Sequence, residues 1–291
     1  GIVISFNHML LILIQLADAF SLVPGLLEYG LPLREAMVTK GIFDRGQPLL
    51  QLVTIVGSSL ALAMVPQVTN INWQMNKQDT LEKIQLTTKY GTILSVGATT
   101  GLVMLLPEIN GLLYQNAAGS NVLRLLAVSL LFTSLSITFA SAIQGFGYTR
   151  WTAIVLFIGL WLKIILNQLL VPCLGINGGA VATLVTVMFI CLTNLFLVRR
   201  RIKKERLFTF SWLKILAAGL IMAAFLFIVK LAYIWMNLPD SRFILLLFVM
   251  FNVVAGFLVF MYAVKYLNVL SREEWHTLPI IGKLKKGRLH K

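Results

Sequence analysis

Eight apolar runs, each long enough to cross a lipid bilayer, limit the possible folds of this chain more than any other feature. They cover approximately residues 2–23, 48–69, 87–107, 122–143, 150–172, 178–198, 212–235 and 243–268. A transmembrane helix needs about 20 mostly apolar residues. The strict alternation of polar and apolar residues that marks a membrane β-strand is missing from these runs. The sequence therefore predicts an all-α integral membrane protein with eight transmembrane helices.

The composition supports the same class. The chain is 58% hydrophobic and 12% charged, whereas a soluble domain is about 45–50% apolar and about 25% charged. A formal net charge of +14 would suggest nucleic acid in a soluble protein. Here most cations lie in short loops between apolar runs, where anionic lipid head groups attract them. We therefore expect anionic lipids, and no nucleic acid, as partners of the basic loops.

The distribution of cations predicts the orientation in the membrane. The loops after the second, fourth and sixth runs and the tail after the eighth contain Lys and Arg, most densely in RRRIKKER, residues 199–206. The loops after the third and fifth runs contain neither, and the loop after the seventh has only Arg242. Because cytoplasmic loops are rich in Lys and Arg, the basic side is predicted to be cytoplasmic. With eight helices, both ends of this chain are then cytoplasmic.

The loop after the first run, residues 24–47, is long and its charges nearly balance. Its segment LEYGLPLREAMVTKGI has amphipathic spacing, which indicates either a short surface helix or the first turns of a longer second helix. Elsewhere, Gly97 and Gly101 form G-x-x-x-G, a spacing that favours close helix packing in lipid. Small residues at 178–180 and 182 predict a second close contact.

Asp44 and Arg45 stand side by side at the start of the second run. One interpretation is a local ion pair at the outer boundary, which would contribute little. The other is that Arg45 faces a cavity as an anion ligand, with Asp44 holding it or coupling to a cation. Gln47 and Gln51 are four residues apart and share a helical face, so they would continue a polar track. The residues alone leave both interpretations open.

Two further charges lie within apolar runs. Asp18 is in the outer half of the first run, with Gln15 on the same face, and it belongs either at head-group level or on a cavity wall. Lys163 is in the middle of the fifth run, with Asn167 one turn later. A charge at the bilayer centre costs about 2.5–3.5 kcal/mol, so we predict that Lys163 faces inward. Arg45 and Lys163 together would suit an anionic ligand such as a lipid-linked pyrophosphate.

Motifs for catalysis or cofactor binding are missing from the sequence. There is no G-x-x-x-x-G-K-[ST] phosphate loop, no H-E-x-x-H and no G-x-S-x-G. Two cysteines and three histidines form no metal-binding pattern. The sequence therefore predicts no cofactor, no metal site and a transporter rather than an enzyme.

One segment resembles a known family. The stretch KGIFDRGQPLLQLVTIVGSSLALAMVPQVT, residues 40–69, is similar to the eighth helix of bacterial polysaccharide biosynthesis transporters. That group includes the stage V sporulation protein B type and the MurJ-type lipid II flippases, and it belongs with the MATE drug exporters to the MOP superfamily. The segment GINGGAVAT, residues 175–183, resembles a recurring loop-to-helix pattern of that superfamily.

The resemblance implies a particular architecture. Family members have about fourteen helices, in two six-helix lobes and a final pair. This chain would supply the C-terminal portion and would be a fragment whose partner is the missing N-terminal lobe of the same protein. Residues 1–198 would form the second lobe, 199–211 a basic cytoplasmic loop, 212–268 the terminal helix pair and 269–291 a basic cytoplasmic tail. The location would be the bacterial cytoplasmic membrane.

The resemblance also implies a function. MurJ-type members move an undecaprenyl-pyrophosphate-linked precursor, lipid II, across the membrane by alternating access of a V-shaped cavity. By match to the motif, Arg45 would hold the pyrophosphate of such a lipid-linked oligosaccharide, and Asp44 would act in gating or coupling. The residue patterns add Lys163, Gln47 and Gln51 as substrate contacts and Asp18 as a coupling or gating residue.

Three other functions remain open from the sequence. A MATE-like drug or cation antiporter would need exposed acids in its cavity, and Arg45 and Lys163 argue against it. A non-transporting membrane scaffold of cell-wall synthesis is compatible with the basic loops. A membrane glycosyltransferase would show a cytoplasmic acidic cluster, which the sequence does not contain.

Overall fold

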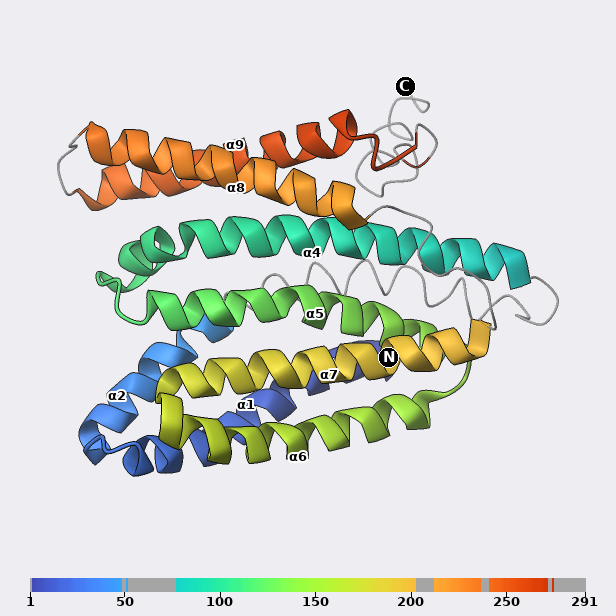
Figure 1. Ribbon diagram of the computed structural model, residues 1–291, viewed down its shortest axis with the longest axis horizontal. Helices are drawn as coiled ribbons and strands as arrows, with labels where there is room; N and C mark the ends of the chain where they lie inside the picture. The colour runs from blue at the N-terminus through green and yellow to red at the C-terminus, as the bar shows by residue number, and fades with distance from the viewer. Residues whose placement is uncertain are drawn as a thin grey trace, which may run out of the picture.

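The computed structural model describes residues 2–48, 51, 77–202, 212–236, 241–271 and 274, and within these ranges the chain is helical without strands (Figure 1). The helices are α1 (Ile2–Glu28), α2 (Leu33–Asp44), α4 (Lys77–Tyr114), α5 (Ser120–Gly145), α6 (Thr149–Leu174), α7 (Ile176–Ile202), α8 (Trp212–Trp235) and α9 (Arg242–Tyr266). All of them except α2 are long and apolar enough to span a membrane. The all-α membrane fold is therefore confirmed. The predicted run 48–69 lies outside the described residues, apart from Pro48 and Gln51.

Several helices extend beyond their apolar runs. Helix α1 continues through Pro24 to Glu28 because Leu26 beyond the proline is fully buried in the core. Helix α4 has 38 residues, about 57 Å at 1.5 Å per residue, whereas the hydrocarbon core is about 30 Å thick. Its polar first turns therefore continue past the span predicted at 87–107. Helix α7 likewise extends to Ile202, into the region predicted as a loop.

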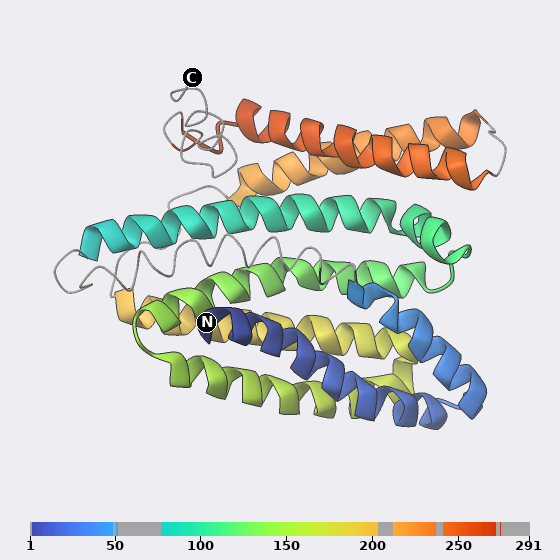
Figure 2. The same ribbon diagram turned by 180° about the vertical axis from the view of Figure 1, so that it is seen from behind.

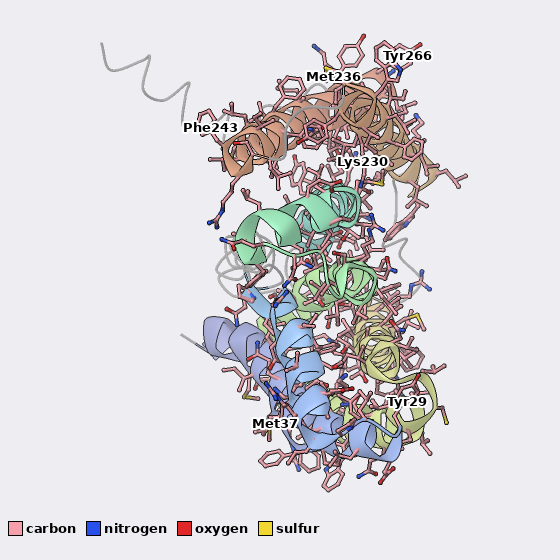
Figure 3. All side chains as sticks on the ribbon, turned by 90° about the vertical axis from the view of Figure 1, so that its left-hand side faces the viewer. Tyr29, Met37, Lys230, Met236, Phe243 and Tyr266 are labelled. Atoms are coloured by element: carbon pink, nitrogen blue, oxygen red, sulfur yellow. The ribbon has the colours of Figure 1, made fainter. Side chains whose placement is uncertain are left out.

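The amphipathic segment after α1 forms the separate short helix α2. Its buried side consists of Ala36 and Phe43, and Phe43 packs in a core cluster with Leu22 and Leu26. Met37 lies outside this buried side and is 57% exposed, and Figure 3 shows it at the outer surface of the molecule. The chain turns at Arg45 before residues 46–48 resume a helical conformation.

The long helices lie side by side in alternating directions, with α5 in the interior (Figures 1 and 2). Helix α5 packs against α4 on one side and α7 on the other, and α6 packs against both α7 and α1. The terminal helices α8 and α9 pack on each other and on α4. Most of α5 is buried, including hydroxyl side chains that donate to backbone carbonyls one turn earlier, such as Ser141 to Ile137 (2.8 Å).

The predicted G-x-x-x-G contact is confirmed at the junction between α4 and the terminal pair. A Cβ atom at Gly97 would lie 2.8 Å from the ring of Phe260 in α9. A Cβ at Gly101 would lie 3.0 Å from the methyl group of Met222 in α8. The two glycines thus receive large side chains from two different helices. An ion pair of 2.5 Å between Lys230 of α8 and Glu108 of α4 adds to this junction, and Figure 3 shows Lys230 between the two layers.

The two ends of the bundle carry different connections. The start of α4, the α5–α6 turn, the end of α7 and the start of α8 share one end, which is on the right in Figure 1. This end carries Arg150 and the three arginines that finish α7. The α1–α2, α4–α5, α6–α7 and α8–α9 connections share the other end, and all of them except the charge-balanced α1–α2 connection are loops predicted to be poor in cations. The grouping agrees with the predicted alternation, and the assignment of one end to the cytoplasm stays a prediction.

Candidate functional site

Arg45 follows the last residue of α2 and contacts the end of α4 and the turn after it. Its Nη1 donates to Oδ1 of Asn116 at 2.7 Å. Its guanidinium lies over the ring of Tyr114, 4.6 Å from the centroid. The arginine is half-buried. Both partners are electrically neutral, so neither cancels the positive charge of Arg45.

Asp44 does not pair with Arg45. Its Oδ2 lies 2.5 Å from Nζ of Lys40, one helical turn earlier on α2. Residues four apart share a helix face, whereas adjacent residues do not. Asp44 therefore lies on the same face as Lys40 and not on that of Arg45. The predicted Asp44–Arg45 ion pair, and the idea that Asp44 holds Arg45, are therefore both wrong. The gating or coupling role of Asp44 stays a prediction.

One hydrogen bond between side chains of the predicted polar track connects α1 to the residues after α2. Nε2 of Gln15 donates to Oε1 of Gln47 at 3.0 Å. Both side chains are half-buried, whereas Gln51 is exposed. Gln47 and Gln51 therefore lie in different surroundings, although sequence spacing placed them on one face.

Asp18 and Lys163 form an ion pair in the interior of the bundle. Nζ of Lys163 lies 2.8 Å from Oδ1 of Asp18, and the side-chain exposures are 0% and 2%. The inward orientation predicted for Lys163 is confirmed. The pairing itself was missed, although both residues lie at a similar distance from the same end of their helices. The similar depth became visible only once α1 was found to continue to Glu28, because the run predicted at 2–23 placed Asp18 nearer its end.

Further polar groups complete a network among α1, α6 and α7. The ammonium of Lys163 also donates to Oδ1 of Asn167 (3.1 Å), the carbonyl of Gly179 (2.9 Å) and Oγ1 of Thr183 (2.7 Å). Nδ2 of Asn167 donates to Oδ1 of Asp18 (2.9 Å) and Oγ of Ser21 (2.7 Å). The close approach of α7 that this network needs depends on glycine, since a Cβ at Gly179 would lie 2.7 Å from Leu22 of α1.

The structure therefore separates the two cations that the sequence grouped together. Lys163 is enclosed by oxygens of its own bundle, whereas Arg45 contacts the α4–α5 turn. The predicted joint anion site of Arg45 and Lys163 is not formed in this conformation. No carboxylate among the described residues pairs with Arg45, whereas Lys163 pairs with Asp18.

Two other arginines at the same end of the bundle also bind neutral oxygens. Nε of Arg124, at the start of α5, donates to the carbonyl of Val103 at 3.2 Å. Arg242, at the start of α9, donates to the carbonyl of Leu112 from Nε at 3.2 Å and from Nη2 at 3.0 Å. Arg124 and Arg242 are thus two further cations at the end of the bundle that carries Arg45. Over the described part of the chain, no group of three or more His, Cys, Asp or Glu could hold a metal ion.

A second polar cluster lies at the opposite end of α4. Nζ of Lys89 contacts both carboxylate oxygens of Glu274, at 2.9 and 2.7 Å, and the hydroxyl of Tyr90 donates to the carbonyl of Glu274 at 2.8 Å. The backbone N–H of Ser271 donates to the same carboxylate at 2.6 Å. Partial burial acts to raise the pKa of Glu274, but the hydrogen bonds from Lys89 and Ser271 outweigh it and hold this pKa below its usual range. The segment after α9 is thereby attached to α4.

One family model and two relatives match the sequence of this chain. A family model described as MatE matches residues 43–169. The uncharacterized membrane protein YabM of Bacillus subtilis is 33% identical over 286 residues, which are 98% of this chain and 53% of that protein. An uncharacterized membrane protein of Methanocaldococcus jannaschii is 30% identical over 169 residues, 57% of this chain and 38% of that protein. The chain thus spans about half of the first relative and less of the second.

A solved structure supports the fold. The lipid II flippase MurJ, in an inward closed conformation, matches with a TM-score of 0.55 and 18% identity, over 80% of this chain and 53% of that one. These findings confirm the predicted resemblance to the MOP and MATE superfamily and the MurJ-like fold. They support a multi-pass membrane protein.

Proposed function

We propose that this multi-pass membrane chain, which matches a MatE family model over residues 43–169 and has a MurJ-like fold, is the C-terminal portion of a flippase. The cargo is a lipid-linked oligosaccharide pyrophosphate, with lipid II as the first candidate. Residues 1–198 form the second lobe and 212–268 the terminal pair. Both ends of this chain, the loop 199–211 and the tail 269–291 face the cytoplasm of a bacterium, where the basic residues contact anionic lipids. An N-terminal lobe of the same protein completes the transport cavity.

The observation that carries the proposal is that Arg45 pairs with no carboxylate in the part of the chain that the structure describes. Lys40 neutralises the adjacent Asp44, and the partners of Arg45 are an amide oxygen and an aromatic ring. A guanidinium offers a planar fork of donors that matches two phosphate oxygens. Its contact with Asn116 is exposed, so an anion from outside could reach the guanidinium. A pyrophosphate would take the place of Asn116 as the acceptor.

The surroundings of Arg45 suggest how binding is linked to movement. Oδ1 of Asn116 accepts from Arg45 and also from the backbone N–H of Ala118 in the α4–α5 turn. Transfer of Arg45 to a phosphate would break its hydrogen bond to this turn and leave Ile42 of α2, beside Gly119, as the remaining contact. Gln47, which is tied to Gln15 of α1, and the exposed Gln51 would then contact the cargo beside Arg45.

The buried pair has a different role in the proposal. Asp18 acts in coupling or gating because its carboxylate links α1 to α6 and α7 through Lys163 and Asn167. Lys163, predicted from sequence as a substrate contact, acts through Asp18 in the conformation described here. A drug or cation antiporter is less well supported, since Asp18 and Asp44 are each neutralised by a lysine.

Complementation in cells depleted of their lipid II flippase tests the proposal. The full-length protein should restore growth as wild type, and Arg45→Ala should not. Arg34→Ala is the matched control, because Arg34 lies on α2 with an exposed side chain, and it should restore growth. Immunoblots of membrane fractions would establish equal amounts of each variant. Equal growth with Arg45→Ala would remove Arg45 from the mechanism, and no growth with wild type would favour another lipid-linked sugar or the scaffold.

A further inference from the structure

Helix α4 contains a backbone carbonyl that the helix itself cannot pair. Proline has no backbone N–H, so Pro107 inside α4 cannot donate to the carbonyl of Val103, four residues earlier. Nε of Arg124, on α5, donates to this carbonyl instead, at 3.2 Å. Prolines inside helices commonly cause bends, and Figure 1 shows that α4 bends near its C-terminal end. Arg124 thus supplies the hydrogen bond that Pro107 removes.

A second arginine contacts the last turn of α4. The last four carbonyls of a helix have no partner within that helix. Leu112 is one of these residues, because α4 ends at Tyr114, and its carbonyl accepts from Nε (3.2 Å) and Nη2 (3.0 Å) of Arg242 on α9. One turn earlier, Glu108 pairs with Lys230 of α8. The last turns of α4 are therefore bound by side chains from α5, α8 and α9.

The turn after α4 is bound to these last turns. Nδ2 of Asn110, which is buried, donates to the carbonyl of Ala118 at 2.8 Å and to Oγ of Ser120 at 3.1 Å. The backbone N–H of Ala118 donates to Oδ1 of Asn116 at 3.3 Å. Asn110 thereby connects the end of the helix to the turn that follows it. We call residues 108–118 the α4 tip.

The α4 tip carries both neutral partners of Arg45. The guanidinium lies over the ring of Tyr114, and its Nη1 donates to Oδ1 of Asn116 at 2.7 Å. Because Pro107 removes a main-chain hydrogen bond between the tip and the rest of α4, side chains from other helices hold the tip in place. A residue that fixes the tip therefore also fixes the surroundings of Arg45.

We propose that Arg124 and Arg242 are positioning residues for Arg45. Arg124 fixes the base of the α4 tip and Arg242 fixes the last turn of its helix, so that Tyr114 and Asn116 face Arg45. Because Arg242 belongs to α9, the terminal helix pair takes part in forming the Arg45 site. This role deepens the proposed function and rests on it for transport, whereas the arrangement of the tip does not depend on the cargo.

Thermal unfolding of the full-length protein in detergent tests the relation between Arg124 and Pro107. Arg124→Met should lower Tm by about 2–4 °C, because the carbonyl of Val103 loses its partner. Pro107→Ala supplies a main-chain N–H to that carbonyl. In the Pro107→Ala background, Arg124→Met should therefore change Tm by less than about 1 °C. An equal loss of Tm in both backgrounds would overturn the proposal, because Arg124 would then not act through Val103.

Pulsed electron paramagnetic resonance measures the position of the tip. Nitroxide labels are attached to cysteines introduced at Leu113 on the tip and Met37 on α2, both exposed, in a full-length protein without other cysteines. Arg124→Met and Arg242→Met should each shift or broaden the distance distribution. Arg150→Met is the matched control, since Arg150 is exposed at the opposite end of the bundle, and it should give the wild-type distribution. An unchanged distribution would overturn the role of the arginine concerned.

A second variant covers the case in which Arg124→Met cannot be recovered folded. The double variant Pro107→Ala/Arg124→Met should still fold, because its backbone pairs the carbonyl of Val103. Loss of both variants would overturn the proposal. The Tm and label measurements need no cargo, so they test the inference whatever molecule the protein transports.

Growth of cells depleted of their lipid II flippase connects the position of the tip to transport. Arg124→Met should complement less well than wild type, and Arg124→Lys, which keeps a donor, should recover part of the loss. Full complementation by Arg124→Met, beside none by Arg45→Ala, would overturn the positioning role. If Tm and label distances change as expected but Arg45→Ala complements fully, the proposed role of Arg45 fails while the arrangement of the tip stands.

Discussion

The carboxylate of Asp18 and the ammonium of Lys163 lie 2.8 Å apart in the interior of the bundle, where neither has access to solvent. The pair connects α1 to α6, and the partners of Lys163 extend the connection to α7. Two charges that would each be costly in a membrane therefore cancel at the point where three helices meet. The movement of these helices relative to one another is restricted by this pair.

The first prediction concerns the coupling of the two charges. Asp18→Asn and Lys163→Met should each reduce the free energy of unfolding by about 3–5 kcal/mol, because each leaves a buried charge without its partner. The double variant should be less destabilised than the sum of the two, because no unpaired charge remains. Denaturant unfolding of the three variants in mild detergent measures this difference, and simple additivity would contradict the pairing.

The second prediction concerns the charge of Arg45. Asn116→Asp would place a carboxylate next to the guanidinium and cancel its charge, so complementation by the full-length protein should fall at least as far as with Arg45→Ala. Asn116→Ala removes the hydrogen bond but leaves the charge available, and it should retain more activity than Asn116→Asp. Growth of depleted cells measures both. The opposite order would show that the hydrogen bond, and not the free charge, is what matters.

The third prediction concerns the fit of α4 against α9. Gly97→Ala should lower stability by about 1–3 kcal/mol, because its Cβ would lie 2.8 Å from Phe260. Replacing Phe260 with Leu in the same chain should recover part of the loss. Gly111→Ala is the control, since its Cβ would have an ordinary 3.8 Å contact with Leu245. Equal Tm values for Gly97→Ala and Gly111→Ala would argue against the close packing described here.

The fourth prediction concerns pH and the attachment of the segment after α9. The pKa of Glu274 is held below its usual range in the folded protein. Its contribution to stability is therefore complete above the ordinary glutamate pKa of about 4.3 and is lost as pH falls through the lower folded value. Fluorescence energy transfer between labels on this segment and on the first turns of α4 should report detachment at that acidic pH.

A matched variant isolates the carboxylate in this fourth experiment. Glu274→Gln keeps the shape but cannot ionise, so its energy transfer should be lower than that of wild type at neutral pH and should change little on acidification. An identical pH profile for Glu274→Gln and wild type would assign the detachment to another group.

Much of the fold was predictable because it depends on local patterns. Runs of apolar residues marked every long helix among the described residues, and the spacing of Gly97 and Gly101 marked a tight contact. The ends of the helices were less predictable. A helix that leaves the membrane becomes polar, as in the first turns of α4, and hydropathy then no longer distinguishes it from a loop.

The site was less predictable than the fold, because its contacts join residues far apart in the chain. The sequence identified Asp18, Lys163 and Arg45 as unusual charges but could not assign their partners. Arg45 contacts Tyr114 and Asn116 from a distant turn. Asp44, its neighbour in sequence, is drawn to Lys40 by helical periodicity instead.

The ion pair between Lys230 and Glu108 has a consequence for the evolution of the two last helices. Truncating the protein before α8 would leave Glu108 of α4 without its lysine partner and would remove the side chains that pack against Gly97 and Gly101. A shorter descendant would first have to lose the acid and enlarge the glycines. Once acquired, the terminal helices would therefore be difficult to discard.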